Sequence, residues 1–159
     1  MTIKACLKIR AATAGDVEHL VALINAAFLV ERFFIDGDRT NVDDVGRLLA
    51  SGTFLVQDGA DGLEAAIYAE ARGERAYLGL LAVAPDRQGQ GVGRQMLDAA
   101  EAWCAARGCR AIDIRVVSIR PELFPIYMGR GYVRRGTSPF PAEHSPKLPC
   151  HFIDMSKDL

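Results

Sequence analysis

Seven stretches of the chain are apolar runs or alternate between apolar and polar residues, and each predicts a β-strand. They are 7–10, 53–57, 63–72, 76–83, 111–117, 132–135 and 151–155. Four further stretches predict helices, at 17–28, 42–50, 92–107 and 121–130. The resulting order, β-α-α-β-β-β-α-β-α-β-β, indicates an α/β protein with a mixed sheet and helices on its faces.

The turn between the strand at 76–83 and the helix at 92–107 is rich in glycine. Its three glycines alternate with other residues, namely Gly89, Gly91 and Gly93. Glycine allows a tight turn and a close approach of a ligand to the backbone. The first N–H groups of a helix lack intrahelical partners and lie at the positive end of its dipole. Such a turn is typical of a phosphate-binding loop, and Arg87 and Arg94 add positive charge on either side.

Two common phosphate-binding patterns do not fit this turn well. The P-loop pattern needs Gly-Lys followed by Ser or Thr, which is absent. The dinucleotide pattern G-x-G-x-x-G would end at Arg94 or Met96 instead of glycine. Asp113 nevertheless lies about twenty residues further on, where a ribose-binding acid is expected. A dinucleotide-binding module therefore stays open as an alternative.

A third pattern, Gln/Arg-x-x-Gly-x-Gly/Ala, fits residues 88–93 (Gln-Gly-Gln-Gly-Val-Gly) at every position. With the preceding strand, Pro85 and the following helix, this segment resembles the coenzyme A motif of the GNAT superfamily of N-acetyltransferases. The resemblance implies a mostly antiparallel sheet of six to seven strands, with a splay between the fourth and fifth strands at a bulge near Leu80 and Leu81. It covers nearly the whole chain, so we expect a single domain over 1–159.

A second segment, 120–132, resembles the family pattern Asn…Tyr-x-x-x-Gly-Phe. Tyr127 matches the tyrosine, whereas Arg120 replaces the asparagine. Because Pro125 falls inside the predicted helix, we expect that helix to be kinked or to begin late.

The resemblance also implies which residues hold acetyl-CoA. The backbone of the fourth strand would pair with the pantetheine arm, and the glycine turn would bind the diphosphate. The implied cofactor-binding residues are Leu81, Ala82, Val83, Gln88, Gly89, Gln90, Gly91, Val92, Gly93, Arg94, Arg120, Phe124 and Tyr127. No residue is implied as a metal ligand.

Transfer of an acetyl group to an amine needs a proton for the departing thiolate and a neutral amine. A phenol with a pKa of about 10 suits the first role, and we assign it to Tyr127. Many family members carry a glutamate where this chain has Tyr77. The nearby carboxylates Glu70 and Glu31 are candidate bases acting through water, and Glu70 is our candidate catalytic carboxylate.

The resemblance also implies an acceptor pocket that is lined by the first two helices, their loop and the last hairpin. The candidate substrate-binding residues are Phe33, Phe34, Asp36 and Tyr77. Phe28 lies on the apolar face of the first helix, so we expect it to be a core or dimer contact. His144 lies in the nearby proline-rich loop, and we expect an ordinary loop residue.

Composition limits the function further. The formal net charge of −1 offers no electrostatic footprint for nucleic acid and no polybasic tract for a membrane surface. No apolar run reaches the length of a membrane span, and Met1–Leu7 lacks the apolar core of a signal peptide. Four cysteines without C-x-x-C spacing indicate reduced thiols in a cytoplasmic protein.

Together these features predict an acetyl-CoA-dependent N-acetyltransferase. We expect it to acetylate a primary amine, of a small molecule, by direct attack in a ternary complex. A non-catalytic acyl-CoA-binding sensor and a protein N-acetyltransferase of the same fold are the alternatives. A homodimer is one assembly open to the chain, since symmetric pairing is common.

Overall fold

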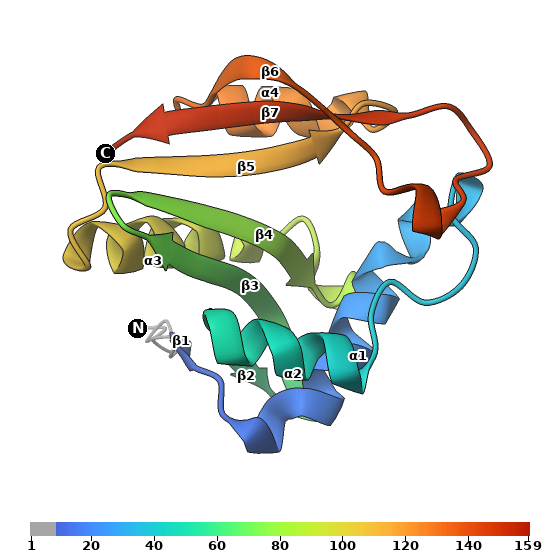
Figure 1. Cartoon of the computed structure of the whole chain (residues 1–159). Coiled ribbons are helices and arrows are strands. Elements are labelled where there is room, and N and C mark those ends of the chain that lie inside the picture. Colours follow the sequence, from blue (N-terminus) through green and yellow to red (C-terminus); the bar gives the residue numbers. More distant parts are fainter. Residues whose placement is uncertain (1–8) are drawn as a thin grey trace.

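The computed structural model describes residues 9–159, in which helices cover both faces of a seven-stranded sheet (Figure 1). The strands are β1 (Ile9–Ala11), β2 (Thr53–Gly59), β3 (Gly62–Arg72), β4 (Arg75–Val83), β5 (Ala111–Val117), β6 (Val133–Pro139) and β7 (His151–Asp158). Their spatial order is β1-β2-β3-β4-β5-β7-β6. Only the β4–β5 pair in this sheet is parallel.

The helices follow the predicted order. They are α1 (Val17–Ala27), α2 (Val42–Ser51), α3 (Val92–Ala106) and α4 (Phe124–Met128). Short 3-10 turns connect them: η1 (Ala14–Asp16), η2 (Phe28–Phe33), η3 (Pro85–Arg87), η4 (Pro121–Leu123) and η5 (Ala142–His144). The mixed α/β architecture is thus confirmed. Leu7 and Lys8 of the first predicted strand, and Cys6, lie outside the described residues.

Period-two alternation in the central strands assigns their side chains to two cores. Phe54 and Tyr68 pack with α1 and α2 on one face of the sheet, whereas Leu55 and Ile67 pack with α3 on the other. All four side chains are buried. Strands β2, β3 and β4 thus lie between the two cores. The site lies at the end of these strands.

A β-bulge interrupts the alternation in β4. Tyr68 pairs with Gly79, yet Ala66 pairs with Ala82, so one residue of β3 faces two residues of β4. Leu78 faces α3 before the bulge, and Leu81 faces it afterwards. An extra residue moves every following side chain to the other face, and it also bends the strand. Leu80 marks the distortion with a φ of 50°.

Ion pairs brace the start of α1. Arg10 donates to Asp16 at 2.9 Å and to Asp58 at 2.8 Å. The backbone N–H of Thr13 also donates to Asp16, at 2.8 Å, as part of a capping box. The Arg10 guanidinium holds the pKa of Asp16 well below its usual range.

The predicted helix at 121–130 is divided into η4 and α4, and the prediction of a late start is confirmed. Pro125 stands in the first turn of α4, where its missing N–H costs no hydrogen bond. Strand β6 extends beyond the predicted 132–135 and ends at Pro139. Strand β6 lies at an edge of the sheet, where a proline needs no ladder partner.

No helix within residues 9–159 is long and apolar enough to cross a membrane. Within the same range, no group of His, Cys, Asp and Glu side chains has the arrangement of a metal site. Cys104 and Cys109 are buried and Cys150 is half-buried, and all three are free thiols.

Candidate active site

The glycine turn links the end of β4 to α3, and its backbone conformation requires glycine. Gly89 has a φ of 77° and Gly91 a φ of 83°, both in the left-handed region. The side chain of Gln88 donates to the carbonyl of Val83 at 3.1 Å, which holds the turn against the strand. No side chain caps the first turn of α3 in the described chain. Its N–H groups are therefore available to an anion.

The same turn faces open space. A Cβ built at Gly89 or Gly91 meets no atom within 4 Å. The turn therefore has both the donors and the room that a diphosphate needs, so its residues fit the coenzyme that the sequence predicts.

Strands β4 and β5 are paired over a short stretch only, and then they separate. Their parallel pairing runs only from Arg75 with Ala111 to Tyr77 with Asp113. Beyond Tyr77 the bulge bends β4 away, and the two strands diverge toward the glycine turn (Figure 1). The predicted splay between the fourth and fifth strands is confirmed.

A cavity of about 500 Å³ occupies this opening. Its walls include Leu78–Leu81 of β4, Ile114–Val117 of β5 and Tyr127 of α4. Gln88 lines it at the glycine turn, and η2 and η5 supply residues at the opposite end. Such a volume is typical of a small-molecule site, and it is continuous from the anion-binding turn to a mixed polar and aromatic region.

Tyr127 directs an unpartnered hydroxyl to this cavity. Within residues 9–159 the hydroxyl makes no hydrogen bond, while its ring meets that of Tyr132 edge-on at 5.8 Å. Burial raises the pKa of the Tyr127 phenol, which keeps its proton on at neutral pH. Glu101 of α3 holds the segment that follows α4, because it accepts from Tyr132 at 3.2 Å and from Arg130 at 3.1 Å.

Tyr77 forms part of the cavity floor. A Cβ at Gly79 would lie 2.8 Å from the Tyr77 hydroxyl, so the ring lies across that glycine. On the other side, the Arg72 guanidinium lies 5.0 Å from the centre of the same ring. These contacts fix the ring at the point where β4 and β5 separate.

A half-buried ion pair crosses the cavity at its far end. Arg120 donates to Glu31 of η2 at 3.2 Å, and to Glu122 at 3.1 Å. The side chains of Glu31 and Arg120 are only 13% and 14% exposed. Burial raises the pKa of Glu31, and the positive charge of Arg120 opposes that rise. Arg120, which replaces the family asparagine, thus joins two segments that are far apart in sequence.

Glu70 has a different environment from Glu31. It accepts from Tyr68 at 3.0 Å and from Arg72 at 3.1 Å, and it does not line the cavity. The hydrogen bond from Arg72 lowers the pKa of Glu70, so it is the weaker base of the two carboxylates.

Three of the four predicted substrate-binding residues also lie away from the cavity. Phe34 is fully buried, Phe33 is 50% exposed, and Asp36 forms an ion pair with Lys147 at 2.9 Å. Tyr77 is the one that lines it. Phe28 packs against the core beneath α1 and α2, as the sequence favoured, and it also lines the cavity.

The predicted cofactor residues fall into three groups. Leu81, Val83, Gln88, Arg120 and Tyr127 line the cavity. Residues 89–94 form the turn and the first residues of α3 beside the cavity. Ala82 and Phe124 are buried in the core, where Phe124 supports α4.

Asp113 does not face the glycine turn. It accepts from Arg75 at 2.6 and 2.9 Å, at the end of β4 remote from that turn. A ribose-binding role beside the turn, on which the dinucleotide alternative depended, has no support in this geometry.

Comparison with known proteins agrees with the architecture. Residues 17–132 match the model of the "Acetyltransferase (GNAT) family". The chain belongs to the GNAT family of acetyltransferases. Its members are acyltransferases, so the prediction of an enzyme of this class is confirmed. No curated protein sequence matches the chain.

Solved structures that share its fold do so at low sequence identity. Ard1 from Thermoplasma volcanium has a TM-score of 0.77 at 17% identity, over 96% of this chain and 97% of that one. The ribosomal-protein-S18-alanine N-acetyltransferase from Escherichia coli has a TM-score of 0.75 at 15% identity, over 95% and 92%. The IAA acetyltransferase from Bacillus cereus has a TM-score of 0.74 at 14% identity, over 96% and 99%.

Proposed function

We propose that this GNAT protein transfers an acetyl group from acetyl-CoA to the primary amine of a small molecule, by direct attack in a ternary complex. The observation that carries the proposal is the continuous cavity from the glycine turn, past Leu81 and Tyr127, to Glu31. Its volume suits a small acceptor, and a net charge of −1 provides no broad field for a charged macromolecule. The cytoplasmic location and the homodimer stay predictions.

The residues of the turn and of the splay hold the coenzyme in this proposal. Backbone N–H groups of residues 89–93 bind the diphosphate at the positive end of α3. The edge of β4 beyond Tyr77 is not paired with β5, so the backbone of Leu81 and Val83 is available to the pantetheine arm. When bound, acetyl-CoA supplies the thioester whose acetyl carbon the amine attacks.

The proton balance of the transfer assigns roles to two side chains. A bond forms between the amine nitrogen and the acetyl carbon, the carbon–sulfur bond breaks, and one net proton is released for each ammonium acetylated. An alkylamine costs about 4–5 kcal/mol to deprotonate at pH 7. Glu31, with its raised pKa, accepts that proton directly or through water. Tyr127 donates a proton to the departing sulfur, whose thiol pKa is about 8.5.

Glu70 is retained as the alternative base acting through water. Its bonds to Tyr68 and Arg72 and its position outside the cavity favour Glu31. Replacing each carboxylate separately by glutamine distinguishes them, since only loss of the base shifts the pH dependence of kcat/KM.

Substitution of Tyr127 by Phe tests the proposal. We expect kcat to fall about 100-fold or more, which is typical of a lost general acid, with the Kd for CoA changed less than about threefold. Thiol release from acetyl-CoA in the presence of an amine panel measures the rate. The control is Tyr132→Phe, because the Tyr132 hydroxyl binds Glu101 instead of facing the cavity. Undiminished turnover in Tyr127→Phe would remove its role as acid.

The same assay separates an enzyme from an acyl-CoA-binding sensor. A sensor would bind CoA tightly and show no amine-dependent thiol release with any amine. Acetylation of peptide N-termini or lysines in preference to small amines would instead support a protein N-acetyltransferase.

A further inference from the structure

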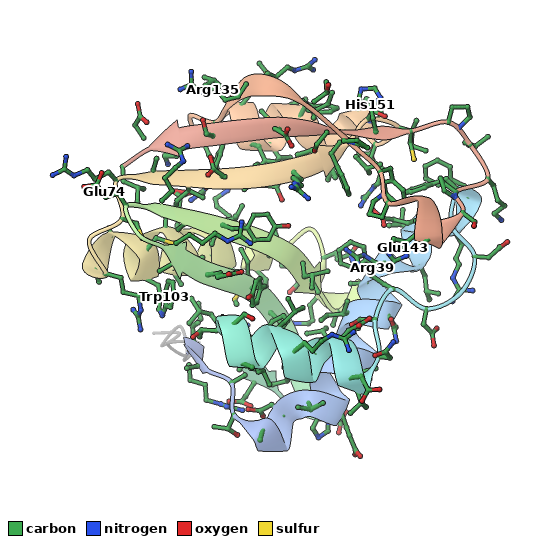
Figure 2. The ribbon with its side chains drawn as sticks, in the orientation of Figure 1. Arg39, Glu74, Trp103, Arg135, Glu143 and His151 are labelled. Carbon is green, nitrogen blue, oxygen red and sulfur yellow. The ribbon has the colours of Figure 1, made fainter. Side chains whose placement is uncertain are left out.

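The far end of the cavity presents a carboxylate and a guanidinium from one short segment. Glu31 belongs to η2, and Arg39 lies in the loop between η2 and α2. Both line the main cavity, and both also line an adjoining hollow of about 10 Å³. Figure 2 shows Arg39 beneath the segment that carries Glu143, where the loop of η5 meets η2.

Arg39 differs from the other arginines of the cavity because it has no ion-pair partner within residues 9–159, although its positive charge acts to lower the pKa of Glu31. Arg120 pairs with Glu31, and Arg115 lies 3.8 Å from Asp154. Arg39 makes no ion pair within the described chain, and its guanidinium lies 5.4 Å from the centre of the Phe28 ring. A guanidinium held beside a cavity by an aromatic ring is well suited to bind a carboxylate with two hydrogen bonds.

Asp38 does not neutralise Arg39. Asp38 is an acidic residue of the loop that also lines the cavity, and the Arg32 guanidinium lies 3.4 Å from its carboxylate. Asp38 is thus paired with Arg32, and Glu31 is paired with Arg120. Within residues 9–159 the Arg39 guanidinium makes no side-chain hydrogen bond, so its donors are available to a ligand.

The carboxylate of Glu31 has one oxygen that can still accept a hydrogen bond from a ligand. Arg120 occupies its Oε2 atom, and within residues 9–159 no hydrogen bond is made to Oε1. A carboxylate oxygen in this position can accept a hydrogen bond from an ammonium or amine group. The cavity therefore offers opposite charges to the two ends of a zwitterion.

The surface around these two charges is apolar. Phe28, Ile35 and Phe140 line the same end of the cavity, and Phe140 stacks against Phe152 with ring centres 5.1 Å apart. Aromatic and branched side chains favour an apolar group on the ligand.

We propose that the acceptor is an α-amino acid with an apolar side chain, whose carboxylate binds Arg39 and whose amine binds Glu31. This inference rests on the proposed function, and it names the substrate class. It adds a specificity residue, Arg39, that contacts the carboxylate and takes no part in the transfer itself.

Three probes isolate the contribution of the carboxylate: phenylalanine, phenylalanine amide and phenethylamine. We expect kcat/KM for phenylalanine to exceed that for either of the others at least tenfold. The amine of the amide is the least basic, with a pKa of about 7.7–8.0 expected for an α-amino group, so intrinsic reactivity alone would favour the amide. A preference for phenylalanine therefore reports recognition.

Arg39→Gln should lower kcat/KM for phenylalanine at least tenfold and leave phenethylamine within threefold, and Arg39→Lys should restore part of the loss. Arg47→Gln is the matched control, because Arg47 is exposed on α2 and does not line the cavity. Equal rates for all three probes, or an equal loss on all three in Arg39→Gln, would overturn the inference.

A failure of the inference can be distinguished from a failure of the proposed function. If phenethylamine turns over and phenylalanine does not, the transferase stands and the amino-acid specificity is wrong. If no amine releases thiol, calorimetry of phenylalanine with the CoA-loaded protein decides. Binding that Arg39→Gln abolishes would support the amino-acid site, whereas no binding would overturn it.

Discussion

A glutamate at Gly91 should abolish tight CoA binding and leave the protein folded, whereas the same change at Gly108 should leave binding intact. These glycines flank the same helix, since Gly91 precedes α3 and Gly108 comes shortly after it. Their φ angles are 83° and 81°, and a Cβ at either position meets no atom within 4 Å. The pair therefore carries the same backbone penalty and the same added charge.

The expected effects on stability are close and have a definite order. A non-glycine residue in the left-handed region costs about 1–2 kcal/mol. The helix dipole returns about 0.3–1 kcal/mol to a carboxylate at the N-terminus and opposes one at the C-terminus. Gly91→Glu should thus be at least as stable as Gly108→Glu. Each kcal/mol corresponds to a fall in Tm of about 2–4 °C for a chain of this size.

The effect on affinity follows from Coulomb's law. A carboxylate about 5 Å from a diphosphate with two negative charges costs about 2 kcal/mol even when screened as in water. That energy raises the Kd at least about tenfold, and partial exclusion of water raises it further.

Isothermal titration calorimetry with CoA measures the Kd of both variants, and thermal melts measure their stability. Salt should narrow the difference in Kd between Gly91→Glu and Gly108→Glu, because screening weakens the repulsion. A folded Gly91→Glu protein that binds CoA as tightly as Gly108→Glu would refute the assignment of the glycine turn.

Two further predictions concern stability. Asp16→Asn should cost about 1–3 kcal/mol at pH 7, because it removes charged hydrogen bonds from Arg10. The lowered pKa of Asp16 makes this contribution complete above about pH 4–5 and lost progressively as pH falls toward the folded pKa, so urea melts of wild type and variant should begin to converge below about pH 4. Gly52→Ala should cost about 1–3 kcal/mol, since its Cβ would lie 2.6 Å from the Ala69 carbonyl oxygen. Gly46→Ala, in α2 with no atom within 4 Å, should instead gain about 0.5–1 kcal/mol in the same melts.

The coenzyme end of the site could be predicted from the sequence because its determinants are local. The run from 111 to 117 places Asp113 and Arg115 at alternate positions among apolar residues, and β5 has those bounds. The glycine spacing at 89–93 reflects backbone angles that few other residues adopt, which makes the turn visible in the sequence. The bulge at Leu80 and Leu81 leaves no such local signal, and only the family resemblance indicated it.

The acceptor end was predicted less well because its determinants are tertiary. Helical periodicity placed Phe28 against the core, where it packs, but it did not show that α1 ends at Ala27 and that η2 follows. In a 3-10 helix, residues three apart lie on one face, so Phe28 and Glu31 reach the cavity together. Arg39 carries no sequence signal, since its significance depends on which neighbouring charges already have partners.

The central claim is that the glycine turn before α3 binds the diphosphate of acetyl-CoA, with the acyl end in the splay between β4 and β5. A crystal structure of the complex with acetyl-CoA tests it most directly. The account predicts diphosphate oxygens about 2.7–3.2 Å from the backbone nitrogens of residues 89–93, and the thioester between Leu81 and Tyr127. A coenzyme bound elsewhere, with this turn free of phosphate, would contradict it.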